Sequence, residues 1–213
     1  MRIFTTLAAI VGVFALGLQS AITIGEFLAE GKTVLDALWR LVRQFTIWSN
    51  VTVTVVMAAA AIAPKSWFTD MRVWLFAVPP LVITGTVYYT LLKFRYEPAP
   101  FHVHLAQDML HAAMPTLSAL AFLSAKHGAL KFKHFGWGAL QGGIYGVYIL
   151  IRGAFEGSYP YWFVNAPALG WWGSIKSAVM LMSAFSVVAL IFIAMDKALA
   201  RFGSGFAGRA QPR

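Results

Sequence analysis

The sequence predicts an all-α integral membrane protein, a bundle of about six transmembrane helices. Hydrophobic residues make up 59% of the 213-residue chain and charged residues only 12%. Soluble domains carry roughly a quarter charged residues, so this chain has too little polar surface to cover a water-exposed globule. Its apolar residues also gather in long, mostly uncharged runs of the ~20 residues that a helix needs to cross a bilayer.

Six stretches have this length, at residues 3–24, 45–63, 73–92, 105–125, 135–155 and 171–195. Pro79-Pro80 is expected to kink the third span, and Pro115 lies inside the fourth. Asp196-Lys197 is expected to end the sixth. In the fifth, the glycines at 138, 142 and 146 recur every four residues on one face, a pattern typical of closely packed membrane helices.

A different segment precedes the second span. Its apolar residues recur at steps of three and four, namely Val34, Leu35, Leu38, Leu41, Val42 and Phe45. Asp36, Arg40, Arg43 and Gln44 occupy the other faces. This periodicity predicts a short amphipathic helix that lies in the membrane interface and leads into the second span.

One transmembrane domain is expected over residues 1–202, with a short disordered tail at residues 203–213. Residues 1–21 resemble a signal peptide, but their apolar run exceeds the usual ~7–15 residues, which favours a retained helix. With six spans, ten of the 17 Lys and Arg residues lie on the side of both termini. This excess predicts that the N-terminus and the C-terminus are cytoplasmic.

The net charge of +9 does not indicate a nucleic-acid partner, because the basic residues are scattered between apolar runs. They are expected to flank membrane helices and to attract anionic lipid. The chain has no cysteine, which excludes disulfides and thiolate metal sites. Because the basic residues flank apolar spans, membrane lipids are the expected partners.

Three groups of polar residues gather at the ends of the predicted spans. Because burying polar side chains in a membrane costs free energy, these residues are functional candidates. They are Thr46, Ser49 and Asn50; His102, His104, Asp108 and His111; and Arg152, Glu156, Tyr159, Tyr161 and Asn165. The odd-numbered loops of a six-span protein share one side of the membrane. The three groups are therefore expected to converge on one face.

The first group occupies one helical face, since its members lie at positions i, i+3 and i+4. A purely structural interpretation is that the hydroxyls of Thr46 and Ser49 form hydrogen bonds with the preceding helix backbone, or that Thr46 caps the helix. A threonine becomes a nucleophile only beside an activating base.

The second group supplies a suitable base. His104, Asp108 and His111 share one face, and histidine titrates near neutrality, so His111 can act as a general base with Asp108 orienting its ring. The alternative is a structural histidine bonded to a neighbouring helix. His102 and His104 have a spacing that permits metal binding, but no third and fourth ligand is evident.

In the third group, Arg152 and Glu156 lie one turn apart and are expected to pair. The aromatic residues around Pro160 fit an interfacial aromatic belt. A proline between Tyr159 and Tyr161 is equally suited to a rigid loop over a lipid-sized pocket.

Three motifs follow one another along the chain: Phe45-Thr46-x-x-Ser49-Asn50, Asp108-x-x-His111-x-x-x-Pro115, and Arg152-Gly153 leading into Tyr159-Pro160-Tyr161-x-Phe163. In order and spacing they resemble the family of androgen-induced protein and androgen-dependent TFPI-regulating protein, most closely its prokaryotic branch. The resemblance extends from the second span to the loop after the fifth. It implies a prokaryotic cytoplasmic membrane as the location.

Characterised animal members of that family are multi-pass membrane hydrolases that cleave fatty acid esters of hydroxy fatty acids with a threonine nucleophile and a histidine partner. The resemblance implies Thr46 as nucleophile, His111 as base and no cofactor. Residues expected to support them or to bind substrate are Ser49, Asn50, Asp108, Arg152, Tyr159 and Tyr161. Asn165 stands where an acidic residue is expected after the Tyr-Pro-Tyr motif, so no acid is assigned in that loop.

The function expected from these residues is intramembrane hydrolysis of a lipid ester with long acyl chains through an acyl-threonine. Two alternatives remain open. One is a lipid-binding or carrier protein that uses the same polar cavity without chemistry. The other is a metal- or haem-dependent membrane enzyme with His102, His104 and His111 as ligands.

Overall fold

The computed structural model describes residues 1–95 and 98–207, and every regular element within these ranges is helical. The α-helices are α1 (Arg2–Ala29), α2 (Val34–Leu41), α3 (Phe45–Ile62), α4 (Met71–Val87), α5 (Phe101–Asp108), α6 (Met114–Leu123), α7 (Phe135–Glu156) and α8 (Ala166–Ala207). The π-helical turn η2 (Tyr88–Leu92) extends α4, and the π-helical turn η4 (Met109–Ala113) joins α5 to α6. Short 3-10 turns lie in the connections at Trp67–Thr69, Lys93–Arg95, Phe132–His134 and Trp162–Val164.

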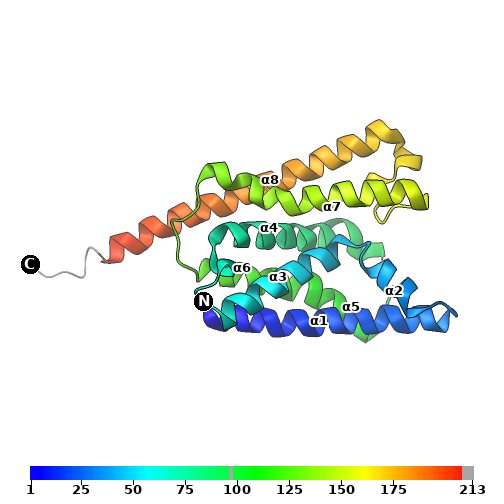
Figure 1. Ribbon diagram of the computed structural model, residues 1–213, viewed down its shortest axis with the longest axis horizontal. Coiled ribbons are helices and arrows are strands. Elements are labelled where there is room, and N and C mark those ends of the chain that lie inside the picture. Colours follow the sequence, from blue (N-terminus) through cyan, green and yellow to red (C-terminus); the bar gives the residue numbers. More distant parts are fainter. Residues whose placement is uncertain (96–97, 208–213) are drawn as a thin grey trace, which may run out of the picture.

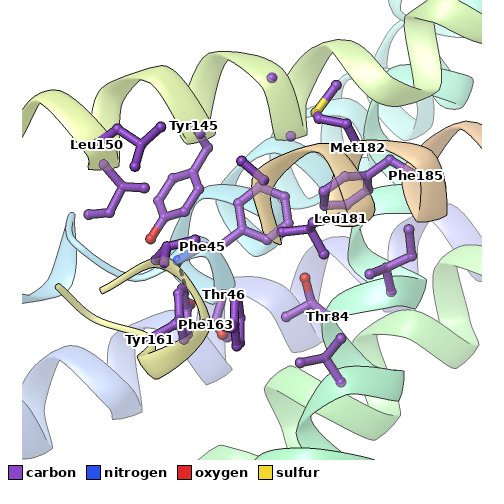
Figure 2. Close-up of a pocket in the computed structure, with 18 of the residues that line it drawn as sticks. Phe45, Thr46, Thr84, Tyr145, Leu150, Tyr161, Phe163, Leu181, Met182 and Phe185 are labelled. Carbon is purple, nitrogen blue, oxygen red and sulfur yellow. Dashed lines mark hydrogen bonds between the residues drawn. The ribbon is translucent and has the colours of Figure 1, made fainter. Parts of the chain in front are cut away.

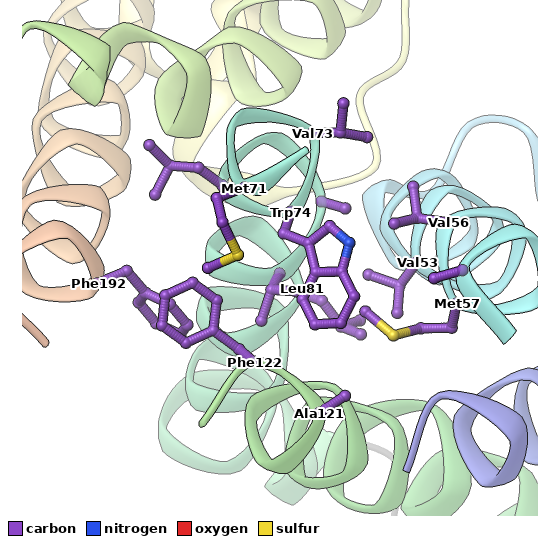
Figure 3. Packing of buried hydrophobic residues seen from close by; sticks show 14 of the residues in the cluster. Val53, Val56, Met57, Met71, Val73, Trp74, Leu81, Ala121, Phe122 and Phe192 are labelled. Carbon is purple, nitrogen blue, oxygen red and sulfur yellow. The ribbon is translucent and has the colours of Figure 1, made fainter. Parts of the chain in front are cut away.

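Helix α4 lies at the centre of the bundle, between α3 and α6 on one side and the paired α7 and α8 on the other (Figure 1). Its Trp74 is only 1% exposed and belongs to an apolar cluster with Met57, Phe122 and Phe192 from three other helices (Figure 3). The indole N–H of Trp74 donates to the carbonyl of Phe68 at 2.8 Å, so this buried ring leaves no polar atom unpaired.

Four helices are long and apolar enough to cross a membrane: α1, α3, α4 together with η2, and α8 from Ala166 to Arg201. The outer helices also expose large apolar side chains. Ile10 of α1 is 61% exposed and Trp172 of α8 is 76% exposed. Extended apolar surface of this kind is unfavourable in water, so these helices suggest insertion into a membrane.

The other two predicted spans are helical but do not meet the same criterion of length and composition. The fourth starts at Phe101 and is divided by η4 just before Pro115, whose missing N–H disrupts regular α-helical bonding. The fifth is the 22-residue α7, in which Gln141, Arg152 and several glycines lower the hydropathy. Four spans, and not six, are therefore supported by length and composition. Helix α4 itself continues as one helix through Pro79 and Pro80.

The short helix predicted before the second span is α2. Thr33 caps it, because its hydroxyl accepts the N–H of Asp36 at 3.2 Å while its own N–H and hydroxyl donate to the Asp36 carboxylate. These two hydrogen bonds from Thr33 hold the pKa of Asp36 below its usual value. The apolar face does not continue as far as Phe45, since α2 ends at Leu41 and Phe45 begins α3.

Helix α8 differs from the predicted sixth span at its end. Gly170 has a φ of 68°, which breaks the helix just before the predicted start at residue 171. The helix does not stop at Asp196-Lys197, however, but continues to Ala207. Residues 203–207 of the predicted tail thus extend α8, and residues 208–213 lie outside the described residues.

Asp196, at the predicted end of the sixth span, is completely buried. Its carboxylate accepts the backbone N–H groups of Gly128 at 3.0 Å and of Leu130 at 2.9 Å. The ring of His127 lies 3.2 Å from the same carboxylate. A buried carboxylate is stable when donors surround it, so Asp196 fixes the connection between α6 and α7.

Candidate functional site

Thr46 and His111 lie in hydrogen-bond contact, although 65 residues separate them in the sequence. Thr46 Oγ1 is 3.2 Å from His111 Nε2. Thr46 belongs to the first turn of α3, and His111, only 6% exposed, belongs to η4. The structure thus brings together the two residues that the order of the loops predicts to lie on one face.

The second ring nitrogen of His111 decides which tautomer faces Thr46. Nδ1 lies 2.9 Å from the backbone carbonyl of Gln107, one helical turn earlier. A carbonyl only accepts, so Nδ1 carries the hydrogen and the neutral ring presents the lone pair of Nε2. Nε2 therefore accepts from the hydroxyl of Thr46, which is the arrangement of a nucleophile and its general base.

The ring of His111 is also held from its face. The ring of Tyr88 stacks on it with centroids 4.0 Å apart and planes 15° apart. Tyr88 begins η2, and His111 lies in the centre of η4, so both partners sit in π-helical turns. Such turns are rare and occur frequently at functional sites.

Ser49 and Asn50 do not point their donors at the hydroxyl of Thr46, but at its backbone. Ser49 Oγ donates to the carbonyl of Thr46 at 3.2 Å and lies 3.3 Å from Thr84 Oγ1. Asn50 Nδ2 donates to the same carbonyl at 2.9 Å and to the carbonyl of Leu110 at 3.3 Å. Both buried side chains therefore fix the helix that carries Thr46.

Pro115 explains why the carbonyl of Leu110 is available to Asn50. In η4 the N–H of Met114 bonds to the carbonyl of Met109, five residues back. The next donor in that register would be Pro115, which has no N–H. Asn50 satisfies the carbonyl that this leaves and ties α3 to η4.

Asp108, predicted to orient His111, makes a different contact. Its carboxylate accepts the hydroxyl of Tyr89 at 2.7 Å. Both nitrogens of His111 are engaged with Thr46 and Gln107, so the carbonyl of Gln107 orients the ring in place of Asp108.

The predicted metal alternative finds no cluster of ligands in the described part of the chain. Within residues 1–95 and 98–207, no group of three or more His, Cys, Asp or Glu side chains is placed to hold a metal ion. His102 lies exposed in the first turn of α5, and His104 is half-buried one turn before Asp108.

Arg152 is buried in a structural cluster. Its guanidinium donates to Glu156 at 2.7 Å, to the hydroxyl of Tyr148 at 2.6 Å and to the carbonyl of Trp39 at 2.9 Å. It also stacks on the ring of Trp39, 3.9 Å from the centroid. The predicted pair with Glu156 is confirmed, and the cluster joins α7 to α2.

The two tyrosines after α7 have different surroundings. Tyr159 packs its ring against Gly153, where even a Cβ atom would collide with it. Tyr161 faces the site, because its hydroxyl accepts the N–H of Phe45 at 3.0 Å, directly before Thr46. Of the two, Tyr161 is therefore placed to meet a ligand.

Two cavities meet at Thr46 and His111. The apolar cavity has a volume of about 270 Å³ and lies among α4, α7 and α8; its lining includes Ile83, Val87, Ile149, Leu181, Met182 and Phe185 (Figure 2). The polar cavity has a volume of about 300 Å³ and lies toward α1, α2 and α5; its lining includes Gln19, Thr23, Glu26, Arg40, Gln44 and Gln107. Thr46, His111 and Tyr161 line both.

Sequence reasoning did not single out Gln107, Tyr88 or Gly85. Gln107 acts through its backbone carbonyl, which leaves no signal in its residue type. Gly85 lies against the backbone of His111 so closely that a Cβ atom would collide with the His111 carbonyl. The only sequence signal of the close approach between α4 and η4 is that Gly85 stands inside a predicted span, where a glycine permits close backbone contact.

Comparisons of the chain with protein-family models, with curated proteins and with solved structures found no match.

Proposed function

We propose that this chain is a multi-pass membrane hydrolase of lipid esters with Thr46 as nucleophile and His111 as general base. The observation that carries the proposal is the 3.2 Å contact between Thr46 Oγ1 and His111 Nε2, with Nδ1 bonded to the carbonyl of Gln107. The three motifs that resemble the androgen-induced protein family support the same assignment. They further suggest fatty acid esters of hydroxy fatty acids as the substrate class.

The reaction proceeds in two halves. His111 Nε2 accepts the hydroxyl proton of Thr46 as Oγ1 attacks the ester carbonyl. The tetrahedral intermediate collapses to an acyl-threonine, and His111 gives its proton to the departing alcohol. Water then attacks the acyl carbonyl while His111 accepts its proton. Collapse releases the fatty acid, and the proton returns to Oγ1.

The oxyanion of each intermediate requires hydrogen-bond donors. Ser49 and Asn50 are engaged with the backbone of Thr46. The backbone N–H of Thr46 itself lies in the first turn of α3, where N–H groups have no partner within their own helix. We assign this N–H to the oxyanion, because the hydroxyl of Tyr161 is engaged with the N–H of Phe45 and with Tyr145.

The two cavities give the substrate an orientation. The apolar cavity suits the acyl chain, since its walls offer almost only carbon atoms. The polar cavity suits the departing alcohol and the incoming water. Arg40 and Gln44 line it and are able to bind the carboxylate of a hydroxy fatty acid.

We also propose that α5–η4–α6 and α7 complete a bundle of six spans. Residues 101–123 form a nearly continuous helical rod, and at ~1.5 Å per residue both this rod and α7 reach ~33 Å, enough to cross a hydrocarbon core of ~30 Å. Six spans put both termini on the same side of the membrane; the excess of Lys and Arg on that side favours the cytoplasm, and the family resemblance suggests a prokaryotic membrane. Cysteines introduced at residue 2 and at the exposed residue 129, between α6 and α7, test this topology. Impermeant thiol reagents should reach both from the same side with six spans, and from opposite sides with four.

The activity is tested by labelling purified protein with a fluorophosphonate probe. Wild type should be labelled at Thr46, and the variants Thr46→Ala and His111→Ala should lose labelling while they remain folded. Mass spectrometry of the labelled peptide identifies the modified residue. Labelling that persists in folded Thr46→Ala would contradict the assignment.

A second candidate function is lipid binding or transport without chemistry. The apolar cavity favours it, since a cavity of that kind holds an acyl chain whether or not Thr46 reacts. A folded wild type that binds lipid but takes up no fluorophosphonate would support this second function.

A further inference from the structure

The three glycines spaced along one face of α7 have different neighbours. A Cβ atom at Gly138 would collide with Ala189, and one at Gly142 would collide with the ring of Phe185. These two glycines let α7 and α8 approach closely, as the sequence pattern predicts. Packing therefore explains why no larger residue stands at either position.

Gly146 continues the same face but packs against nothing. A Cβ atom there would meet no other atom within 4 Å, and the residue lines the apolar cavity. Glycine destabilises a helix interior relative to alanine, so neither packing nor helix stability accounts for it. What its missing side chain leaves is open space inside the cavity.

This space lies in the part of the cavity formed by α7 and α8. Tyr145 of α7 and Met182 and Phe185 of α8 line the same cavity (Figure 2). Thr46 and His111 lie where the cavity meets the polar cavity, so an acyl chain that starts at Thr46 runs toward these helices. At about 270 Å³ the cavity is below the ~300–1,000 Å³ typical of sites for drug-sized ligands, and it suits one chain.

We propose that Gly146 determines the length of the acyl chain that the apolar cavity accepts. The inference rests on the proposed function, because it takes the acyl chain of the substrate as the occupant of this cavity. A side chain at position 146 fills space that a long chain running from Thr46 toward α7 and α8 would occupy. Each methylene that loses its place in apolar surroundings weakens binding roughly fourfold.

The test compares Gly146→Leu with Gly136→Leu in a Thr46→Ala background. Gly136 is the matched control, because it is an exposed glycine of the same helix with no atom within 4 Å of its Cβ position and it does not line the cavity. Binding is measured by cross-linking with photoreactive fatty acids of 10 and 16 carbons. Mass spectrometry locates the attached residues.

Gly146→Leu should lower cross-linking of the 16-carbon probe by at least about tenfold and change that of the 10-carbon probe less than about twofold. Gly136→Leu should change neither. Undiminished cross-linking of the longer probe in the cavity of Gly146→Leu, or equal loss of both probes, would overturn the inference. Should Gly146→Leu not fold, Gly146→Ala must show the same length dependence with a smaller effect.

The background variant lacks the nucleophile, so this result does not depend on hydrolysis. Length-dependent cross-linking combined with an unreactive wild type would retain the role of Gly146 and remove the hydrolase. If wild type reacts with the fluorophosphonate but Gly146→Leu affects both probes equally, the hydrolase is retained and the role of Gly146 is removed.

Discussion

Asn50 donates from one amide nitrogen to the carbonyl of Leu110 at 3.3 Å, and thereby ties the helix of Thr46 to the turn of His111. The same nitrogen reaches the carbonyl of Thr46 at 2.9 Å. Neither bond touches the atoms that react in the proposed hydrolysis, so in that reaction Asn50 is a positioning residue. Its bond to Leu110 exists because Pro115 cannot donate within its own helix.

The variant Asn50→Ala should lower the turnover number of ester hydrolysis by about tenfold or more and leave KM within about twofold, because misplacement of a nucleophile costs rate more than binding. The unpaired carbonyl of Leu110 should also lower the free energy of unfolding by ~1–3 kcal/mol. Val51→Ala is the control, since Val51 is 44% exposed on the same helix. A purely structural role would lower the folded fraction and leave the turnover of folded enzyme unchanged.

Gly85→Ala tests the distance between Thr46 and His111 directly. The new Cβ atom would collide with the carbonyl of His111, a backbone atom that cannot rotate away, so η4 must shift. A displacement of ~1 Å is able to reduce turnover ~100-fold. We therefore expect a large loss of fluorophosphonate labelling in a protein that still folds.

Gly17→Ala provides the comparison for that variant. A Cβ atom at Gly17 of α1 would meet nothing within 4 Å, so the change should stabilise the helix by up to ~1 kcal/mol and leave labelling intact. Wild-type labelling of Gly85→Ala would show that η4 tolerates the shift and that the contact is not critical.

Tyr88→Leu tests the ring stacked on His111. Loss of the aromatic contact, worth ~0.5–1.5 kcal/mol, should let the imidazole turn and lower the labelling rate about three- to tenfold. Tyr88→Phe keeps the ring and should stay within about twofold of wild type. Equal rates for the leucine and phenylalanine variants would exclude an orienting role for the stack.

The sequence predicted the helical class and the shared face of the groups that contain Thr46 and His111, because both follow from coarse features, whereas the pairing of these two residues came from the family resemblance. Long apolar runs predict helices, and the order of the loops predicts a shared face. The partner of Nδ1 was not predictable in this way. The side chain of Asp108 is a visible candidate in the sequence because it lies on the expected helical face. The actual partner is the backbone carbonyl of Gln107, and since every residue has a backbone carbonyl, no residue type marks it.

The number of spans and the end of α8 were less predictable, because burial depends on neighbours. In the sequence, Asp196 resembles the charged end of a membrane helix. Only the structure shows that N–H groups of the connection after α6 bind its carboxylate. Likewise, the structural role of Arg152 is evident only from its contacts with the carbonyl and the ring of Trp39 of α2. Such pairings join segments about 70 and 113 residues apart and leave no local pattern.

Asp196→Ala is expected to destabilise the protein strongly without touching the site. The substitution leaves the N–H groups of Gly128 and Leu130 and the ring of His127 without their buried acceptor. Each buried donor left without its acceptor costs ~1–3 kcal/mol, so the loss of free energy of unfolding should reach several kcal/mol. Thermal or denaturant unfolding in detergent measures the loss. Labelling per folded molecule should match wild type, because this cluster holds the connection between α6 and α7 and not the turns around Thr46.

Asp70→Ala is the contrasting variant for this last experiment. Asp70 pairs with Arg72 at 2.6 Å and caps α4, but its side chain is 28% exposed, so its loss should cost only about 1 kcal/mol. The hydrogen bond from Arg72 lowers the pKa of Asp70, so this contribution is present above pH ~4 and is lost as the pH falls further through the lowered pKa. Equal destabilisation by the two variants at neutral pH would show that burial adds nothing to the role of Asp196.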